Sequence, residues 1–449
     1  MRLKEWLLVF AVMLATTGCD RTVPTETSDV RSPSLAAAAA PTLLSETTWG
    51  GPGSDVTEGA AVALDGSSYL VGFTGSFGSS EKLFTVKFDA TGALAWQRTW
   101  DAPGQFIRDE GRDAAVASDG SVYVTGLTFV EGNRALLLKF GPDGTLLWQR
   151  VFGGNAHGDA VAVGSDGSVY VAGALRDAAD AEDLFVIKLS PDGAPLWFKT
   201  WGATGVSEQA QGIAIGPDGN VYVAGVAPRP SEPFLGEFDA VVLKIDPAGN
   251  SIWQRAFAGG DVTDARGGID VAGDGSLYVA GGLQGPSGSG FANDGLILKV
   301  TSEGDLVWAR RWENSFAEGV AVAADGRVVF AGQTSFEQGG DDALVVRLQP
   351  NGKTSDATTW GGVGFDGGRD VAVSPDGTIV LGAFAEQPPY VLAAARGRAS
   401  RAKLSVTTPS LSLVDFPGGV VDPAGLVETP TGTTTYGGGV DAAVVRMAP

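Results

Sequence analysis

A short pattern recurs along the whole chain: an Asp-Gly pair between two apolar runs, as in Ser165-Asp-Gly-Ser-Val-Tyr-Val-Ala-Gly173. Asp-Gly tolerates a positive φ and closes tight hairpin turns, and the β-branched and aromatic residues that follow favour a strand. The turn glycines are Gly66, Gly120, Gly167, Gly219, Gly275, Gly326 and Gly377, and a weaker copy ends at Gly425. Their spacing averages about 51 residues, a period typical of propellers and solenoids.

Each repeat contains a second turn, for example Pro142-Asp143-Gly144. Four residues past the glycine of this turn stands a tryptophan in five repeats: Trp96, Trp148, Trp197, Trp253 and Trp308. A second large ring follows four residues later, and this even spacing places both rings on one face of a strand. Two turns with apolar runs around them give four antiparallel strands per repeat, which is one propeller blade.

The two ends of the chain complement each other. Glu46–Gly51 resembles Thr358–Gly362, which closes a repeat, although no strand of a repeat precedes it. Asp441–Met447 resembles Asp342–Leu348, the third strand of a repeat, and no fourth strand follows. The sequence therefore predicts that the N-terminal strand joins the C-terminal blade and that Trp49 closes the ring, which leaves no blade edge unpaired.

The expected fold class is all-β: a single β-propeller of eight four-stranded blades. Residues 43–449 divided by a repeat of about 51 give eight. The step from Gly425 to Asp441 also equals the step from Gly326 to Asp342. The alternative is seven blades with a long insertion around residues 385–435.

Residues 1–19 have a charged start, an apolar run and small residues, the features of a secretory signal. Gly18-Cys19 resembles a bacterial lipobox, although Thr16 stands where leucine is usual, so we expect lipidation of Cys19, with a plain cleaved signal as the alternative. Residues 20–42 predict a disordered tether and 43–449 the propeller domain. Cys19 is the only cysteine, so no intrachain disulfide forms.

The repeats resemble a known family. Trp360-Gly-Gly-Val-Gly-Phe-Asp366, together with Val371–Gly377 and Ala343–Leu348, looks like bacterial SBBP-type β-propeller repeats. The resemblance implies a secreted or envelope-attached protein, often a lipoprotein, without an assigned reaction, and the family is named for seven blades. The tryptophan spacing is also distantly similar to the docking motif of quinoprotein-like propellers.

The formal net charge of −21 disfavours nucleic acid and anionic lipid surfaces, whose binding depends on Lys and Arg. A basic residue recurs in the third strand of the repeats, as at Lys188 and Lys244. Because it recurs, we interpret it as part of the framework. We expect a monomer that meets the membrane through its N-terminal lipid only.

The sequence predicts no catalytic residues. His157 is the only histidine, and we place it in a polar loop between two repeats with no catalytic role. A quinoprotein-like oxidoreductase is the enzymatic alternative, but the adjacent-cysteine pair of such enzymes is missing. We expect no cofactor; the alternative is a weak Ca²⁺ site formed by Asp177, Asp180, Glu182 and Asp183.

Loops of variable length between the second and third strands offer recognition surfaces on a rigid ring. Candidate contacts for a partner are Phe234, Leu235, Phe238 and Phe291. The predicted function is a non-catalytic, lipid-anchored scaffold that binds an envelope protein at the periplasmic or outer surface of the bacterial cell envelope. Binding of a carbohydrate or the cell wall is the alternative.

Overall fold

A computed structural model describes residues 42–78, 80–102, 108–129, 132–229, 237–259, 262–284, 293–334, 340–395, 399–416, 420–421, 426–430 and 439–449. These residues belong to one compact unit, Ala37–Pro449. All regular elements in these ranges are β-strands, and none of the described residues forms a helix long and apolar enough to cross a membrane. Cys19, the signal sequence and the tether up to residue 41 lie outside the described residues.

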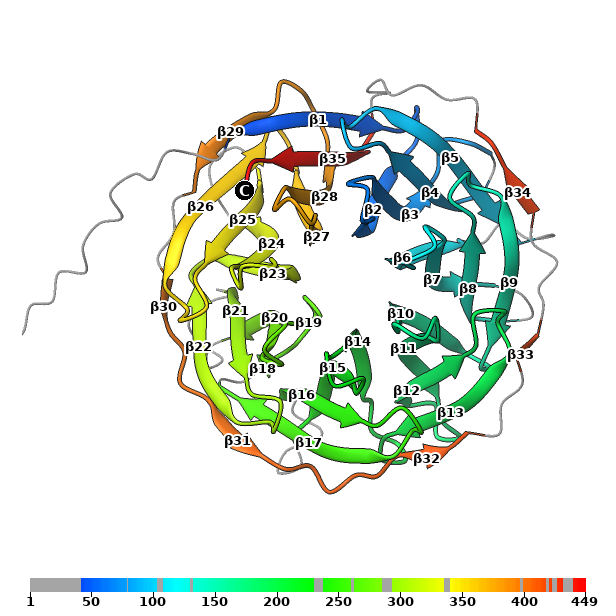
Figure 1. Ribbon diagram of the computed structural model, residues 1–449, viewed down its shortest axis with the longest axis vertical. Coiled ribbons are helices and arrows are strands. Elements are labelled where there is room, and N and C mark those ends of the chain that lie inside the picture. Colours follow the sequence, from blue (N-terminus) through cyan, green and yellow to red (C-terminus); the bar gives the residue numbers. More distant parts are fainter. Residues whose placement is uncertain are drawn as a thin grey trace, which may run out of the picture. The chain divides into compact units, whose positions relative to one another are not determined.

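The described strands form seven four-stranded antiparallel blades around a central opening (Figure 1). Blades one to three consist of β2 (Asp55–Val62), β3 (Ser68–Thr74), β4 (Lys82–Phe88) and β5 (Leu94–Asp101); β6 (Glu110–Val116), β7 (Val122–Thr128), β8 (Arg134–Phe140) and β9 (Leu146–Phe152); and β10 (Ala156–Val163), β11 (Val169–Arg176), β12 (Glu182–Leu189) and β13 (Pro195–Trp201). In each blade the first strand lines the opening and the fourth lies outermost.

Blades four to six follow the same order. They consist of β14 (Gln209–Ile215), β15 (Val221–Pro228), β16 (Phe238–Ile245) and β17 (Ser251–Ala258); β19 (Ile269–Val271), β20 (Leu277–Gln284), β21 (Asn293–Val300) and β22 (Leu306–Trp312); and β23 (Ser315–Val322), β24 (Val328–Thr334), β25 (Ala343–Leu348) and β26 (Thr354–Gly361). The short strand β18 (Val262–Thr263) pairs with β20 and bridges to β16, which joins blades four and five.

Blade seven combines both ends of the chain. Its strands, from the inside outwards, are β27 (Gly367–Val373), β28 (Ile379–Ala385), β35 (Asp441–Met447) and β1 (Leu43–Trp49). β1 pairs antiparallel with β35 from Leu43 opposite Met447 to Trp49 opposite Ala442. The all-β propeller and its closure by the N-terminal strand are confirmed.

The number of blades is seven, so the expectation of eight is wrong and the alternative holds. The chain leaves blade seven after β28 and returns only at β35. This excursion is about as long as one repeat, which is why dividing the length by the period gave one blade too many.

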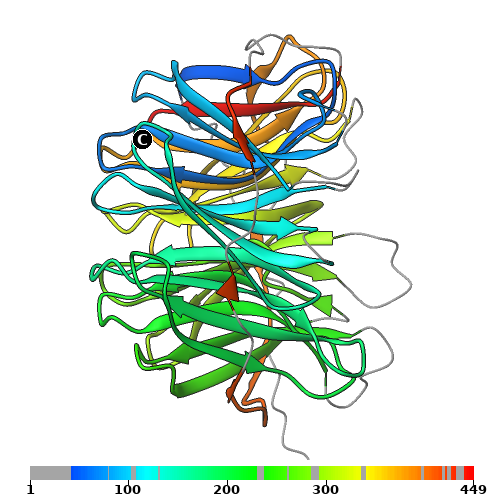
Figure 2. The same ribbon diagram turned by 90° about the vertical axis from the view of Figure 1, so that its right-hand side faces the viewer.

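The excursion forms a belt around the outside of the ring. Its strands are β29 (Val391–Ala394), β30 (Ala399–Arg401), β31 (Ser405–Thr407), β32 (Val414–Asp415), β33 (Val420–Val421) and β34 (Leu426–Glu428). They pair antiparallel with the outer strands of blades six, five, four, three, two and one, in that order. In Figure 2, which shows the ring from its edge, these short orange and red strands lie on the outer surface. The belt supplies hydrogen-bond partners to edges that would otherwise be open.

The repeated rings and bases join neighbouring blades. Trp197 in blade three donates from Nε1 to the carbonyl of Pro247 in blade four at 3.1 Å, and Lys188 donates to the same carbonyl at 3.2 Å while lying over the Tyr170 ring. The same arrangement recurs at Trp96, Trp148, Trp253 and Trp308. The framework interpretation of the recurring base is confirmed, because it ties each blade to the next.

The tryptophan that ends the fourth strand makes a second tie. Trp201 donates to Gln254 Oε1 of the next blade at 2.7 Å, and Trp100 donates to Gln149 Oε1 at 2.8 Å. Trp49 of blade seven makes the same bond to Gln97 Oε1 of blade one, at 2.5 Å. Blade seven, which combines both chain ends, therefore meets blade one through the same contact as the other neighbouring blades.

Candidate functional site

The first strands of all seven blades line a central cavity of ≈ 550 Å³. Six of these strands carry a β-bulge near their start. At each bulge one residue has no partner in the neighbouring strand, and a small or acidic residue follows it. A bulge adds an unpaired residue and changes the direction of its side chain. In this protein it turns one side chain per blade towards the cavity.

The bulged residues form what we call the mouth ring. Its members, from blade one to blade seven, are Glu58, Arg112, Asp159, Gln211, Arg266, Glu318 and Arg369, with Arg266 standing in the break between β18 and β19. Acids, bases and one amide are interspersed. Arg369 lies 3.9 Å from Glu58 across the junction of blades seven and one.

Close approach of the strands limits what can follow the bulge. A Cβ on Gly59 would lie 2.6 Å from the carbonyl oxygen of Arg112, and one on Gly319 would lie 2.8 Å from the Cα of Asp370. Neighbouring strands therefore nearly touch at this level, which holds the mouth ring in a fixed arrangement.

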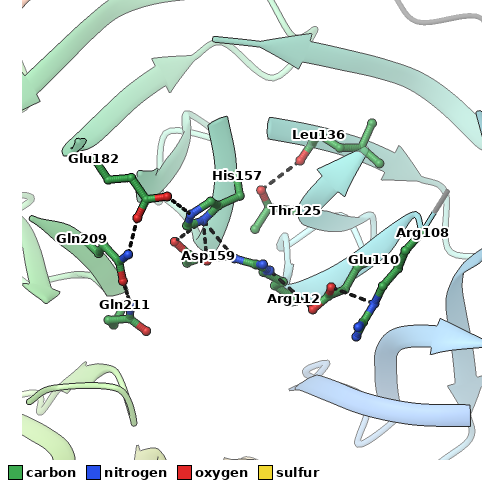
Figure 3. A network of polar contacts seen from close by, with 10 residues as sticks. All are labelled: Arg108, Glu110, Arg112, Thr125, Leu136, His157, Asp159, Glu182, Gln209 and Gln211. Carbon is green, nitrogen blue, oxygen red and sulfur yellow. Dashed lines mark hydrogen bonds and ion pairs between the residues drawn. The ribbon is translucent and has the colours of Figure 1, made fainter. Parts of the chain in front are cut away.

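A network of polar contacts connects the mouth ring across blades two to four (Figure 3). Arg112 pairs with Asp159 in the next blade and with Glu110 Oε1 at 3.4 Å. His157 Nδ1 lies 2.9 Å from Asp159 Oδ2, and its Nε2 faces Glu182 Oε1 at 3.8 Å. Glu182 in turn accepts a hydrogen bond from Gln209.

The network holds His157 in its charged form at neutral pH. Burial alone would lower the pKa of His157, but the carboxylates of Asp159 and Glu182 outweigh burial and raise the pKa to about 9. The hydrogen bond from His157 lowers the pKa of Glu182 to about 2, against the opposing effect of burial. An imidazolium between two carboxylates is a poor general base at neutral pH.

Three further carboxylates tie neighbouring inner strands together deeper in the cavity. Asp113, Asp270 and Asp370 each accept a backbone N–H of the next blade at 2.8 Å, from Val161, Val322 and Ala60 respectively. Burial, together with the charge of Asp370, raises the pKa of Asp113 to about 8. Burial also raises the pKa of Asp270 and of Asp370 to about 6. These acids favour the neutral form or a nearby cation.

His157 does not lie in a loop, so that interpretation is wrong. It is the second residue of β10, opposite Ala174 of β11. The error has a local cause: the Gly153-Gly154-Asn155 sequence looked like a longer link, whereas the strand begins at Ala156.

Three of the four acids considered for Ca²⁺ have separate partners. Asp177 accepts backbone N–H groups of Ala179, Ala181 and Gly205. Asp180 pairs with Arg176 at 2.7 Å, and Glu182 belongs to the His157 network. Burial raises the pKa of Asp183. Among the described residues, no group of three or more His, Cys, Asp or Glu side chains is arranged to hold a metal ion.

Of the predicted partner contacts, only Phe238 is described. It begins β16, opposite Pro228 of β15. Phe234, Leu235 and Phe291 lie outside the described residues. The sequence reasoning missed the mouth ring, although its signal was present. In blades one to three, for example, a charged residue stands eight positions before the turn glycine: Glu58, Arg112 and Asp159 before Gly66, Gly120 and Gly167.

A family model described as "Domain of unknown function (DUF5122) beta-propeller" matches residues 164–195 and 323–354. Each match runs from an Asp-Gly turn to the second turn of the same blade. No curated protein matches the chain.

Several solved structures are distantly similar to this chain. A periplasmic gluconolactonase of Pseudomonas aeruginosa is 15% identical, over 76% of this chain and 100% of that one, with a TM-score of 0.41. An ulvan lyase is 10% identical over 76% and 92%, with a TM-score of 0.45, and the Dos1 propeller is 8% identical over 81% and 95%, with a TM-score of 0.44. At these identities and TM-scores the similarities say nothing about what this chain binds or catalyses.

Proposed function

We propose that this chain is a non-catalytic, lipid-anchored β-propeller of the SBBP type that holds a protein partner at the bacterial cell envelope. The partner binds over the mouth ring, on the face formed by the links between blades and the loops between second and third strands. Cys19 supplies the lipid anchor, and the acidic propeller stands in the aqueous phase.

The observation that supports this proposal is the contrast between two kinds of repeated position. The tryptophans and lysines that join blades keep their chemistry from blade to blade, as a framework must. The mouth ring keeps its geometry, a bulge in nearly every inner strand, yet its chemistry changes from acid to base to amide around the ring. A position whose backbone geometry is kept from blade to blade while the charge of its side chain changes suits the recognition of one asymmetric ligand.

The chemistry of the ring favours a polypeptide segment. The mouth ring intersperses carboxylates and guanidinium groups. A polypeptide, which offers positive and negative side chains and amide hydrogen bonds, therefore finds complementary groups around the whole ring. The cavity of ≈ 550 Å³ has room for a side chain or a chain end. The binding role also agrees with the state of His157, whose two ring nitrogens already face carboxylates.

The test compares two variants of the full chain in detergent in a pull-down from solubilised envelope. One replaces Arg266 with serine and Glu318 with glutamine, which changes the mouth ring at two residues outside the His157 network. The control replaces Arg327 with serine, which removes an exposed ion pair with Asp325 in an Asp-Gly turn on the opposite face. We expect the mouth-ring variant to lose a partner that the control keeps.

Equal capture by both variants contradicts the proposal. Retention of a glycan by the wild type on an array, with no protein captured, assigns the face to carbohydrate instead. Turnover of an ester, lactone or quinone-linked substrate that depends on His157 overturns the non-catalytic role.

A further inference from the structure

The belt leaves the outer edge of one blade open among the described residues. The outer strands of blades one to six each pair with a belt strand. The outer strand of blade seven, β1, pairs with β35 on its inner side and begins the sheet on its outer side. Figure 1 shows β1 at the rim, between β29 and β34.

The six belt strands show what chemistry such an edge accepts. Each is a short antiparallel segment of two to four residues. In five of the six, the residue that lies opposite the terminal ring of the outer strand is small or aliphatic: Leu392 opposite Trp360, Val427 opposite Trp100, Val420 opposite Phe152, Val406 opposite Phe257 and Ala399 opposite Trp312. An extended aliphatic segment is thus the matching partner for an outer strand that ends in Trp49.

Beyond a bulge between Leu43 and Ser45, β1 lacks the features that guard an open edge. Edge strands are usually protected by charges, proline or a bulge. β1 has one charged residue, Glu46, and its carboxylate accepts a hydrogen bond from Trp360 Nε1 at 2.9 Å, so that charge is directed towards blade six. Leu43 and Leu44 are 37% and 53% exposed.

We propose that the outer edge of β1 is a strand-addition site for an extended, aliphatic segment of another protein. The segment runs antiparallel to β1, places an aliphatic residue opposite Trp49, and is held mainly by backbone hydrogen bonds. This surface lies on the rim of the ring and is separate from the mouth ring.

A second copy of β1 matches this edge less well. In the fully overlapped antiparallel pairing the two Glu46 residues stand opposite each other, and like charges in that position destabilise a strand pair. The belt-like segment has no such conflict, so a different protein is the occupant that the geometry favours.

The probe is a labelled synthetic peptide with the sequence of residues 389–395, which contains β29 and its flanks. Its binding to the full-length protein in detergent is measured by fluorescence anisotropy. Two further peptides carry N-methyl groups on alternate amides, one at positions 391 and 393 and the other at 392 and 394. Only one set of amides faces β1 in strand addition, so we expect one methylated peptide to lose binding at least tenfold and the other to keep it.

A matched pair of protein variants locates the edge. Leu44→Lys puts a charge on β1, whereas Leu147→Lys puts one at a site of nearly equal exposure (52%) on β9, a strand whose far end at Val151 and Phe152 already pairs with β33. We expect the first to weaken peptide binding at least tenfold and the second to leave it unchanged.

Four results overturn the proposal. They are no binding of the unmodified peptide, equal loss with both methylated peptides, equal effects of the two lysine variants, and a concentration-dependent dimer that Leu44→Lys abolishes. The last result assigns the edge to a second copy of the chain.

Discussion

Replacing Trp49 with alanine measures how strongly the two chain ends hold the ring closed. The indole is 1% exposed, and its ring centroid lies 4.5 Å from that of Phe84 and 5.4 Å from that of Phe77. Truncating a buried tryptophan costs about 3–5 kcal/mol, and loss of the hydrogen bond to Gln97 adds about 1 kcal/mol. We therefore expect a loss of about 4–6 kcal/mol in the free energy of unfolding.

The assay is equilibrium denaturation in guanidinium chloride followed by circular dichroism. For a chain of this size we take an m-value of about 5 kcal/mol/M, so the midpoint should fall by about 1 M. The comparator is Trp201→Ala, which removes the same contact between blades three and four, where blade three is built from one continuous stretch of the chain.

Similar losses for both variants indicate that the junction of the chain ends is as firm as any other. If Trp49→Ala costs less than about 1 kcal/mol while Trp201→Ala costs several, β1 does not complete blade seven, and the closed ring is refuted.

Three further predictions test the site and the belt. Because burial raises the pKa of Asp113 and of Glu208 to about 8, and the pKa of His157 is raised to about 9, their stabilising effect is present at low pH and is lost as pH rises through those values. Glu182, with a pKa lowered to about 2, acts in the opposite sense and favours stability above pH 4.5. The melting temperature should therefore be highest near pH 4–5 and fall from there towards pH 9, and a curve that rises between pH 5 and 9 contradicts the assignment. His157→Gln should cost about 1–3 kcal/mol at pH 7 and flatten the slope between pH 7 and 9; an unchanged slope in thermal melts would show that His157 is not the titrating group. Leu392→Asp, which puts a charge into the belt opposite Trp360, should cost about 1–2 kcal/mol in chemical denaturation, and no change would mean that the belt does not pack on blade six.

The sequence predicted the blade because its signals are local. Asp-Gly turns need a positive φ, and Gly167 has one, at 79°. Trp197 and Lys188 repeat with the period of the fold, so their joining role could be inferred before any contact was seen. The pairing of β1 with β35 could also be inferred, because each end of the chain carried the half of a blade that the other lacked.

The belt and the mouth ring could not be predicted, because both depend on long-range pairing. Nothing in Val391–Ala394 distinguishes a belt strand from a worn blade strand, and the excursion happens to have the length of a repeat. The direction of the Arg112 side chain depends on a bulge, which only the register of β6 against β7 reveals. The sequence alone therefore could not direct side chains such as that of Asp159 towards the cavity.

The belt also dictates when the protein can be complete. As the belt, the polypeptide pairs with blades six to one in reverse order, and only then does Asp441–Met447 insert between β28 and β1. Leu43 consequently cannot pair until Met447 has been synthesised, and strand pairings between residues so distant in sequence form slowly. A nascent chain that lacks Asp441–Met447 still has an unfinished seventh blade, so the ring can close only after this strand has been synthesised.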